Sequence, residues 1–490
     1  MIKLKSIKAD EAEVTTECLI LPFFTDTKPS AYRGVDSASS GLISRLIKSG
    51  RFRADLKQTI LLHTPGSSFD MLMLVGAGNK KEITAERLRQ TGAAAVRQLD
   101  KQNISGLVFS ASILDSINLK NEFSAAFYLI EGALLASYKF TNYKKNNKGK
   151  SSLKELSAIT SLNPGELKYL RSAVTASLFA RDLVNTPANE LTPSAMASCA
   201  RSLKSSGVNI RVIESKEAKK LGMNAFLSVG QGSRENPKFI IMEYKGGKGS
   251  PVVLIGKSVT FDSGGISLKP VEGMEKMKYD MAGGAAVLGV MKAAADLKLK
   301  VNIAAILPAV ENLPGGRAFR PGDVIKAIDG SSIEVISTDA EGRLTLADAI
   351  GYAVKFLKPK ALIDIATLTG ACDIAFGAET AAMMGNNQEL MTRIKKASDE
   401  TFERVWEMPL FEEYSDYLSS DIADLKNSGR RSGSLMASGA FLKRFAGSVP
   451  WAHLDIAGTA WCEKEKPYIP KGATGMGARL LLKFVRDLEK

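Results

Sequence analysis

The chain has 490 residues, of which 45% are hydrophobic and 24% charged, a balance typical of a globular protein with two to four domains. No run approaches the roughly 18 consecutive apolar residues that cross a bilayer, and the first residues lack the apolar core of a secretory signal, so we expect a cytoplasmic protein rather than a membrane or exported one. Its four cysteines are scattered without Cys-x-x-Cys spacing, which argues against a disulfide framework or a zinc-thiolate site.

The formal net charge is +14, and about half of the excess lies in residues 1–155. Much of it comes from one run, Lys144-Lys145-Asn-Asn-Lys148-Gly-Lys150. We favour a solvated interdomain linker, because the run lacks interleaved aromatic residues and lies between two globular patterns. Contact with DNA or another polyanion remains the alternative.

Residues 1–150 are predicted to form an α/β domain. Apolar runs predict strands at 18–22, 59–63, 71–78 and 106–109. They alternate with helical patterns at 41–50, 84–99 and 123–140. This alternation predicts a largely parallel sheet covered by helices.

Residues 151–170 are expected to form a linker and the start of a connecting helix, and residues 171–490 a second α/β domain. The helix should begin after the cap Asn163 and stop before Pro187. Beyond it, helices are predicted at 282–297 and 344–356, flanking a mixed, mostly parallel sheet. Its strands are predicted near 210–213, 239–244, 252–255, 301–306, 333–336, 361–365 and 453–456.

Charged side chains gather in the stretch Thr338-Asp339-Ala340-Glu341-Gly342-Arg343. If the segment is extended, Asp339, Glu341 and Arg343 leave the backbone on one face. Two carboxylates held side by side repel unless a cation lies between them. The alternative is that both acids simply begin the helix that follows, where they suit its dipole.

A second charged stretch lies about eighty residues upstream. Lys257 directly follows the apolar run 251–256. The next segment, which contains several glycines, carries Asp262, Lys269 and Asp280. We expect the two stretches to follow strands ending at Ile255 and Ile336, at the edge where open α/β sheets bind ligands.

Together the stretches predict a two-metal site with bridging carboxylates. The donors are hard oxygens, which suit Mn²⁺ and Mg²⁺ and are accepted by Zn²⁺. Lys257 could join them only as a neutral amine. The candidate residues are Lys257, Asp262, Lys269, Asp280, Asp339, Glu341 and Arg343.

Three motifs, at residues 259–270, 277–286 and 338–344, resemble the signatures of the leucine aminopeptidases, metallopeptidase family M17. Further motifs at 312–317, 366–371 and 451–461 extend the resemblance over residues 170–490. Ser337 stands where the family usually has Asn, a departure that affects no metal ligand.

The resemblance implies a role for each candidate residue. One metal would be bound by Asp262, Asp339 and Glu341. The other would be bound by Lys257, Asp262, Asp280 and Glu341. Lys269 and Arg343 match the two catalytic positions, and Arg343 would bind a bicarbonate that serves as general base.

The resemblance also implies a macro-like, non-catalytic N-terminal domain and a cytosolic leucyl aminopeptidase with two Mn²⁺ or Zn²⁺ ions per subunit. Such an enzyme removes unblocked Leu and other apolar residues from short peptides in protein turnover. Met277 and Ala457 are candidates for its side-chain pocket. Family members assemble as homohexamers. The open alternatives are a DNA-binding regulatory role through the basic N-terminal third and a metal-dependent phosphoesterase.

Overall fold

The computed structural model describes residues 2–100, 102–145, 151–160 and 162–489. Lys148 and Lys150 of the predicted basic linker lie outside these ranges. The chain divides into two compact units. The first comprises Met1–Val174 with Lys464–Lys471, and the second Thr175–Glu463 with Gly472–Lys490.

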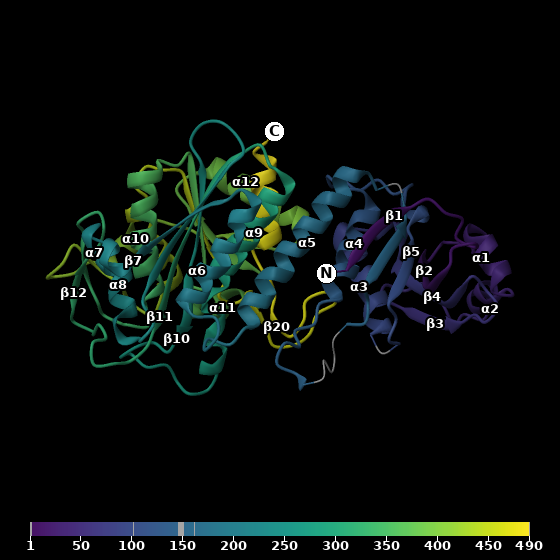
Figure 1. The fold of residues 1–490 in the computed structure, drawn as a ribbon, viewed down its shortest axis with the longest axis horizontal. Coiled ribbons are helices and arrows are strands. Elements are labelled where there is room, and N and C mark those ends of the chain that lie inside the picture. Colours follow the sequence, from purple (N-terminus) through teal and green to yellow (C-terminus); the bar gives the residue numbers. More distant parts are fainter. Residues whose placement is uncertain (1, 101, 146–150, 161, 490) are drawn as a thin grey trace. The chain divides into compact units, whose positions relative to one another are not determined.

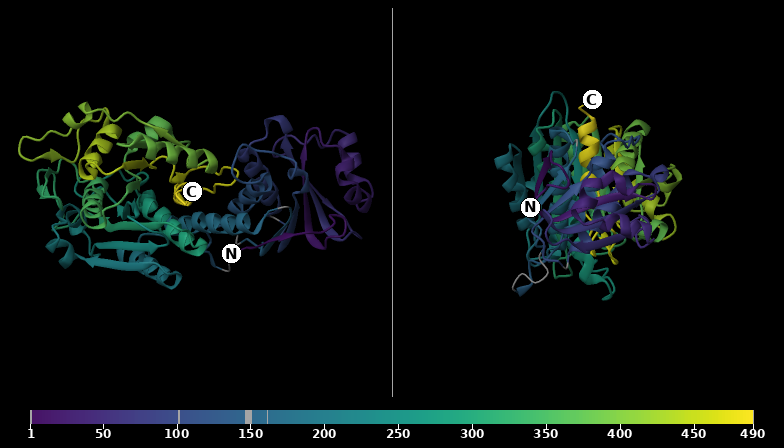
Figure 2. Two further views of the ribbon diagram at one scale, coloured as in Figure 1. Left: turned by 90° about the horizontal axis from the view of Figure 1, so that it is seen from above. Right: turned by 90° about the vertical axis from the view of Figure 1, so that its right-hand side faces the viewer.

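The first unit is built on a six-stranded sheet in the order β1-β6-β5-β2-β4-β3. All neighbours are parallel except β3 and β4. The strands are β1 (Lys3–Ile7), β2 (Thr16–Phe24), β3 (Thr59–His63), β4 (Phe69–Gly78), β5 (Gly106–Ser110) and β6 (Glu155–Ile159). Helices cover both faces, with α3 (Ala85–Leu99) and α4 (Ala125–Ala136) on one side and α1 (Arg33–Ala38) and α2 (Leu42–Lys48) on the other (Figure 1, Figure 2).

Strand β6 falls in the segment expected to be a linker. It pairs on both sides, with β1 and with β5, so it is an inner strand of the sheet. Its five residues are bounded by polar stretches and are too few to give a clear periodic pattern.

A short segment far along the chain completes the first unit. Residues 464–471 lie against α3, where Arg97 Nε donates to the main-chain oxygen of Pro467 at 2.6 Å. The hydroxyl of Tyr468 donates to Glu86 on the same helix at 2.7 Å.

The second unit contains a nine-stranded mixed sheet flanked by helices (Figure 1), as predicted. The central pairs β11/β9, β9/β14 and β14/β18 are parallel, and antiparallel pairs occur toward both ends. Its strands are β7 (Asn209–Glu214), β8 (Lys238–Lys245), β9 (Val252–Gly256), β10 (Ser258–Asp262), β11 (Asn302–Asn312), β14 (Ala361–Ala366), β15 (Ala381–Gly385), β16 (Val405–Glu407) and β18 (Trp451–Asp455).

The helices of this unit include α9 (Ala282–Leu297), which matches its prediction, and α10 (Gly342–Tyr352). Helix α5 (Pro164–Asn185), which joins the two units along the chain, begins with the predicted cap. Asn163 accepts from the main-chain N of Glu166 at 2.9 Å, and Glu166 reaches back to the main-chain N of Asn163 at 3.2 Å. None of the described helices is both long and apolar enough to cross a membrane.

Two consecutive strands run along one neighbour. β9 and β10 both pair in parallel with β11, separated only by Lys257. Asp262, the last residue of β10, lies opposite Asn312, the last residue of β11. The carboxyl ends of β10, β11 and β14 therefore lie at one edge of the sheet, the edge where open α/β sheets bind ligands.

The strand predicted at 333–336 does not belong to this sheet. Residues Ser332–Glu334 form β13, the middle strand of a separate small sheet with β12 (Val324–Lys326) and β17 (Leu425–Lys426). The prediction was wrong because a short apolar run, here Ile333, Val335 and Ile336, cannot show which sheet a strand joins.

Candidate functional site

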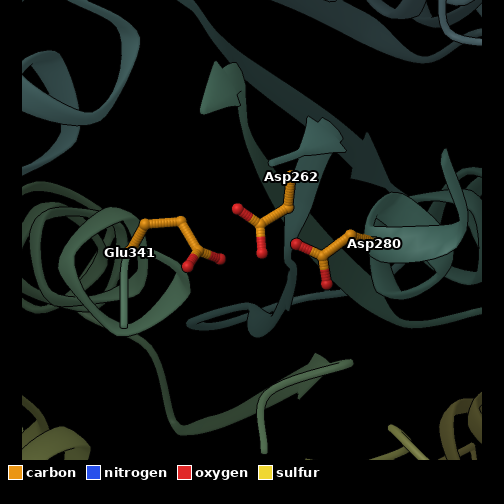
Figure 3. A group of neighbouring side chains, drawn as sticks. All are labelled: Asp262, Asp280 and Glu341. Atoms are coloured by element: carbon orange, nitrogen blue, oxygen red, sulfur yellow. The ribbon is translucent and has the colours of Figure 1, made fainter. Parts of the chain in front are cut away.

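Three buried carboxylates meet at the carboxyl edge of the large sheet. Asp262 ends β10, Asp280 lies in the short helix η7 (Met274–Met281) before α9, and Glu341 precedes α10. One carboxylate oxygen from each residue lies within 4.8 Å of the other two, and Figure 3 shows the three carboxylates pointing toward a common centre. The fourth predicted carboxylate, Asp339, lies beside this group with its side chain 39% exposed.

Two ammonium groups compensate the carboxylates. Lys257 Nζ lies 2.7 Å from Asp280 Oδ2 and 2.9 Å from Glu341 Oε1. Lys269 Nζ lies 2.9 Å from Asp262 Oδ2 and 2.5 Å from Asp339 Oδ1. Each lysine thus bridges two acids, and Lys269 ties the exposed Asp339 to the buried group.

Burial and charge oppose each other in this cluster. Burial raises the pKa of Asp280 well above its ordinary value and also raises the pKa of Asp262, to which Glu341 adds repulsion. Burial alone would lower the pKa of Lys257, but Asp280, Glu341 and Asp262 outweigh it, so the pKa is raised. Burial likewise would lower the pKa of Lys269, but the charges of Asp262, Glu341 and Asp339 outweigh it, so this pKa is also raised. Both lysines are therefore charged in this arrangement.

The stretch that carries Asp339, Glu341 and Arg343 is not extended. Glu341 has φ −78° and ψ −37°, and Arg343 lies in the first turn of α10. The prediction that all three side chains leave on one face was therefore wrong, since it required a period of two. The alternative, that the acids begin the following helix, agrees with the backbone conformation, since Glu341 directly precedes α10. However, the Glu341 side chain makes no cap hydrogen bond and contacts Lys257 instead.

Arg343 points to a different set of partners. Its Nη1 donates to the main-chain oxygen of Asn427 at 2.8 Å, and its Nη2 to Ser438 Oγ at 2.7 Å. Its Nε is buried and has no hydrogen-bond partner among the described residues. Burial lowers the pKa of the guanidinium to about 10, opposed by Glu341 and Asp455, so it stays charged at neutral pH.

Two polar residues that the sequence analysis gave no role hold the acids in place. Asn312 Nδ2 donates to Asp262 Oδ1 at 2.8 Å and to the main-chain oxygen of Thr338 at 2.9 Å. Thr367 Oγ1 donates to Asp280 Oδ1 at 2.7 Å, and its main-chain oxygen accepts from Lys257 at 2.9 Å. Asn312 ends β11, the neighbour of β10, and Thr367 directly follows β14, the neighbour of β9. Their positions at the ends of these strands were the sequence feature that could have identified them.

Two glycines permit close approaches in the site. Gly264 has φ +84°, and a Cβ there would lie 2.4 Å from the main-chain oxygen of Ser267 and 2.9 Å from Asp339 Oδ1. A Cβ on Gly342 would lie 2.5 Å from Lys257 Cε and 2.7 Å from its Nζ. A side chain directly after Glu341 would therefore displace the ammonium end of Lys257.

The donor set fits divalent metal ions. Asp280 Oδ2 is buried, accepts no hydrogen bond from the described residues, and lies 2.7 Å from the ammonium nitrogen of Lys257. A buried carboxylate oxygen without a hydrogen bond requires a cation nearby, which the Lys257 ammonium supplies here and which a metal ion would supply once that lysine is neutral. Three converging carboxylates supply the hard oxygens that Mn²⁺ and Mg²⁺ prefer and Zn²⁺ accepts.

The two residues predicted to line a side-chain pocket are both half-buried. Met277 lies in η7, three residues before Asp280. Ala457 follows β18 and packs against a small apolar cluster that includes Cys372 and Met384.

Comparison with known proteins agrees with this geometry over nearly the whole chain. Residues 178–482 match the catalytic domain of the cytosol aminopeptidase family, and residues 20–147 match its N-terminal domain. The chain is 44% identical over 486 residues to a probable cytosol aminopeptidase of Geobacter sp. (strain M21), covering 97% of each chain. It is 46% identical to one of Geotalea uraniireducens (strain Rf4), covering 93% of each.

Solved structures give the same result. A variant of tomato leucine aminopeptidase aligns with a TM-score of 0.89 at 29% identity, covering 99% of this chain and 97% of that one. The bottromycin maturation enzyme BotP in complex with Mn aligns with a TM-score of 0.87 at 32% identity, covering 97% of this chain and 100% of the other. The carboxylate cluster, the two-domain α/β fold and these matches show that the chain belongs to the cytosol aminopeptidase family, the metallo-aminopeptidases of family M17.

Proposed function

We propose that this protein is a cytosolic leucyl aminopeptidase that removes unblocked N-terminal residues, preferably Leu and other apolar ones, from short peptides. The observation that carries the proposal is the convergence of Asp262, Asp280 and Glu341 within 4.8 Å, next to two lysines. The family membership supplies the reaction class, and the name of the tomato relative supports the leucyl preference.

Five residues would hold two divalent cations, Mn²⁺ or Zn²⁺. Asp262, Asp339 and Glu341 would bind one of them. Lys257, Asp262, Asp280 and Glu341 would bind the other, with Lys257 as a neutral amine after giving up its proton. When bound, such a pair polarises a peptide carbonyl and supplies an activated water at neutral pH. The Mn complex of BotP supports the choice of manganese.

Lys269 would act on the substrate directly. Its side chain is 21% exposed, the more accessible of the two site lysines, and the surrounding carboxylates keep it charged. A fixed ammonium can donate to the carbonyl oxygen as negative charge develops there, which stabilises the transition state more than the substrate. Asp262 and Asp339 would hold that ammonium in place.

Arg343 would bind bicarbonate, the proposed general base. Two of its nitrogens are already held by Asn427 and Ser438, and these contacts fix the plane of the guanidinium. The buried Nε is then left to donate to an anion. No histidine is needed for proton transfer in this arrangement.

Selection of the amino end would depend on the free α-amine, because a blocked amine cannot coordinate a cation and so cannot fix the first carbonyl. Met277 and Ala457 would line the pocket for the first side chain. Assembly as a homohexamer would restrict access to short peptides. The alternative, DNA binding through the basic N-terminal third, gains no support from the relatives described above.

The test is hydrolysis of leucyl-p-nitroanilide and of its N-acetylated form by Mn²⁺-loaded protein. We expect cleavage of the free amine only, and its loss after chelation. The variant Glu341→Gln should abolish turnover while the far-UV circular dichroism spectrum stays unchanged. Cleavage of both substrates at equal rates, or of neither, would refute the proposal.

A further inference from the structure

Asn427 is a fully buried residue that directs all of its hydrogen-bonding groups at one segment of the chain. It follows β17, which pairs in parallel with β13. Its main-chain N donates to the main-chain oxygen of Glu334 at 2.9 Å. Its main-chain oxygen accepts from Arg343, as described above. Both contacts anchor Asn427 to the segment 334–343.

The side chain of Asn427 holds the irregular part of that segment. Its Oδ1 accepts from the main-chain N of Ile336 at 2.8 Å and of Ser337 at 3.3 Å. Its Nδ2 donates to the main-chain oxygen of Ser337 at 2.7 Å and of Ala340 at 3.3 Å. One amide therefore fixes both ends of the loop that contains Asp339 and leads into Glu341.

The amide bonds at once to main-chain groups of Ile336, Ser337 and Ala340. It therefore fixes the distance between the two ends of the loop. A second amide holds the same loop, since Asn312 Nδ2 donates to the main-chain oxygen of Thr338 at 2.9 Å.

We propose that Asn427 is a positioning residue for the metal centre: its amide places Asp339 and Glu341 where they can bind a divalent cation together. This inference rests on the proposed ligand set. It does not make Asn427 a ligand or a group that contacts substrate. Partners that orient metal ligands typically account for a 10- to 100-fold change in metal affinity or activity.

Two substitutions distinguish the effect of loop position on Mn²⁺ binding from the effect of an added charge. Asn427→Asp keeps the volume and the acceptor for Ile336 and Ser337, but turns an anion toward two main-chain oxygens. A negative charge near the cluster would by itself strengthen Mn²⁺ binding, whereas a displaced loop would weaken it. Asn427→Ala removes the amide without adding charge.

Asn386 provides a control in the same unit: it is exposed where Asn427 is buried, but its amide also bonds to main-chain groups on both sides. Its Nδ2 donates to the main-chain oxygen of Val449 at 2.9 Å, and its Oδ1 accepts from the main-chain N of Trp451 at 2.8 Å. It therefore braces a different loop in the same way. Asn386→Ala should alter stability without altering Mn²⁺ binding.

The experiment measures Mn²⁺ dissociation constants by equilibrium dialysis of the full chain, together with kcat and KM for leucyl-p-nitroanilide. Both Asn427 variants should bind Mn²⁺ about 10- to 100-fold more weakly, with kcat reduced and KM within about threefold of wild type. Asn386→Ala should match wild type in all three quantities.

Wild-type Mn²⁺ affinity in either folded Asn427 variant would overturn the inference. So would loss of folding in both Asn427 variants while Asn386→Ala folds, because Asn427 would then contribute general stability. If Asn427→Ala alone fails to fold, the isosteric Asp variant decides. Failure of the proposed function looks different, since wild-type protein would then bind no Mn²⁺ or cleave no substrate.

Discussion

Asn312 Nδ2 donates to Asp262 Oδ1 at 2.8 Å, so the last residue of one strand fixes the carboxylate at the end of its parallel neighbour. Asp262 is, with Glu341, one of the two residues proposed to bind both cations, and its orientation depends on this bond.

Replacement of Asn312 by alanine should reduce kcat/KM about 10- to 100-fold, because Asp262 loses the donor that orients it. The control is Asn302→Ala at the opposite end of β11, where the amide contacts the main-chain oxygen of Gly249 at 2.8 Å. The measurement is kcat/KM of both variants and of wild type from steady-state kinetics with leucyl-p-nitroanilide. Equal rates for the two variants would show that Asp262 is oriented without Asn312.

Metal removal should destabilise the protein. Three buried carboxylates repel one another, and a bound dication relieves that repulsion only in the folded state. Binding at 100 times the dissociation constant adds about 2.7 kcal/mol per site to the free energy of unfolding. Scanning calorimetry should therefore show a melting temperature that rises with Mn²⁺ and falls with chelator, and Asp280→Asn should lose most of this response. The same Mn²⁺ response in wild type and Asp280→Asn would contradict the proposed ligand set.

A methyl group at position 342 should disable the site. In Gly342→Ala the new Cβ would overlap Lys257, whose Nζ lies between Asp280 and Glu341. A displacement of about 1 Å in such a site costs on the order of 100-fold in rate. Gly106→Ala is the control, because the nearest contact of its Cβ is Glu17 Oε1 at 3.8 Å. Retention of full activity by Gly342→Ala would mean that Lys257 can move without consequence.

Asp348 should make stability pH-dependent. It is fully buried in α10 and accepts from the main-chain N of Phe226 and of Ile328, both at 2.8 Å. Burial, opposed by these hydrogen bonds, raises its pKa from 3.8 to about 7. The folded state therefore binds this proton more tightly than the unfolded state, so its contribution to stability is present below pH 4 and is lost as pH rises toward 7.

The full change corresponds to about 4 kcal/mol, at about 1.4 kcal/mol per pKa unit. The measurement is the difference in unfolding free energy between wild type and Asp348→Ala at pH 5, 6, 7 and 8. The unfolding free energy of wild type minus that of Asp348→Ala should fall as the pH rises to about 7 and should stay constant above it. A difference that does not vary with pH would show that Asp348 keeps an ordinary pKa when buried.

The sequence was sufficient for most of the fold and for the residues that meet at the sheet edge. Apolar runs located β9, β11 and β14, and Asp262 could be placed because it comes shortly after such a run. Helix α9 was predicted at its observed bounds because its alanine-rich pattern is long and begins after a charged turn. These features depend on residues close together in sequence.

Features that depend on backbone conformation or on distant residues could not be predicted. The alternation of Asp339, Glu341 and Arg343 suggested a strand, but Glu341 adopts helical dihedrals and α10 begins directly after it. Asn427 gave no signal, since it lies 84 residues beyond Arg343 and its partners are main-chain atoms, which carry no side-chain pattern. Strand β6 was too short to be distinguished from its polar surroundings.

The return of residues 464–471 to the first unit has a consequence for biosynthesis. The contacts of Arg97 and Glu86 with this segment cannot form until almost the entire polypeptide has left the ribosome. The N-terminal unit, although translated first, must therefore wait in an incomplete state, with part of α3 uncovered, while the rest of the chain is made. An expressed fragment that ends at Val174 would remain in that state permanently.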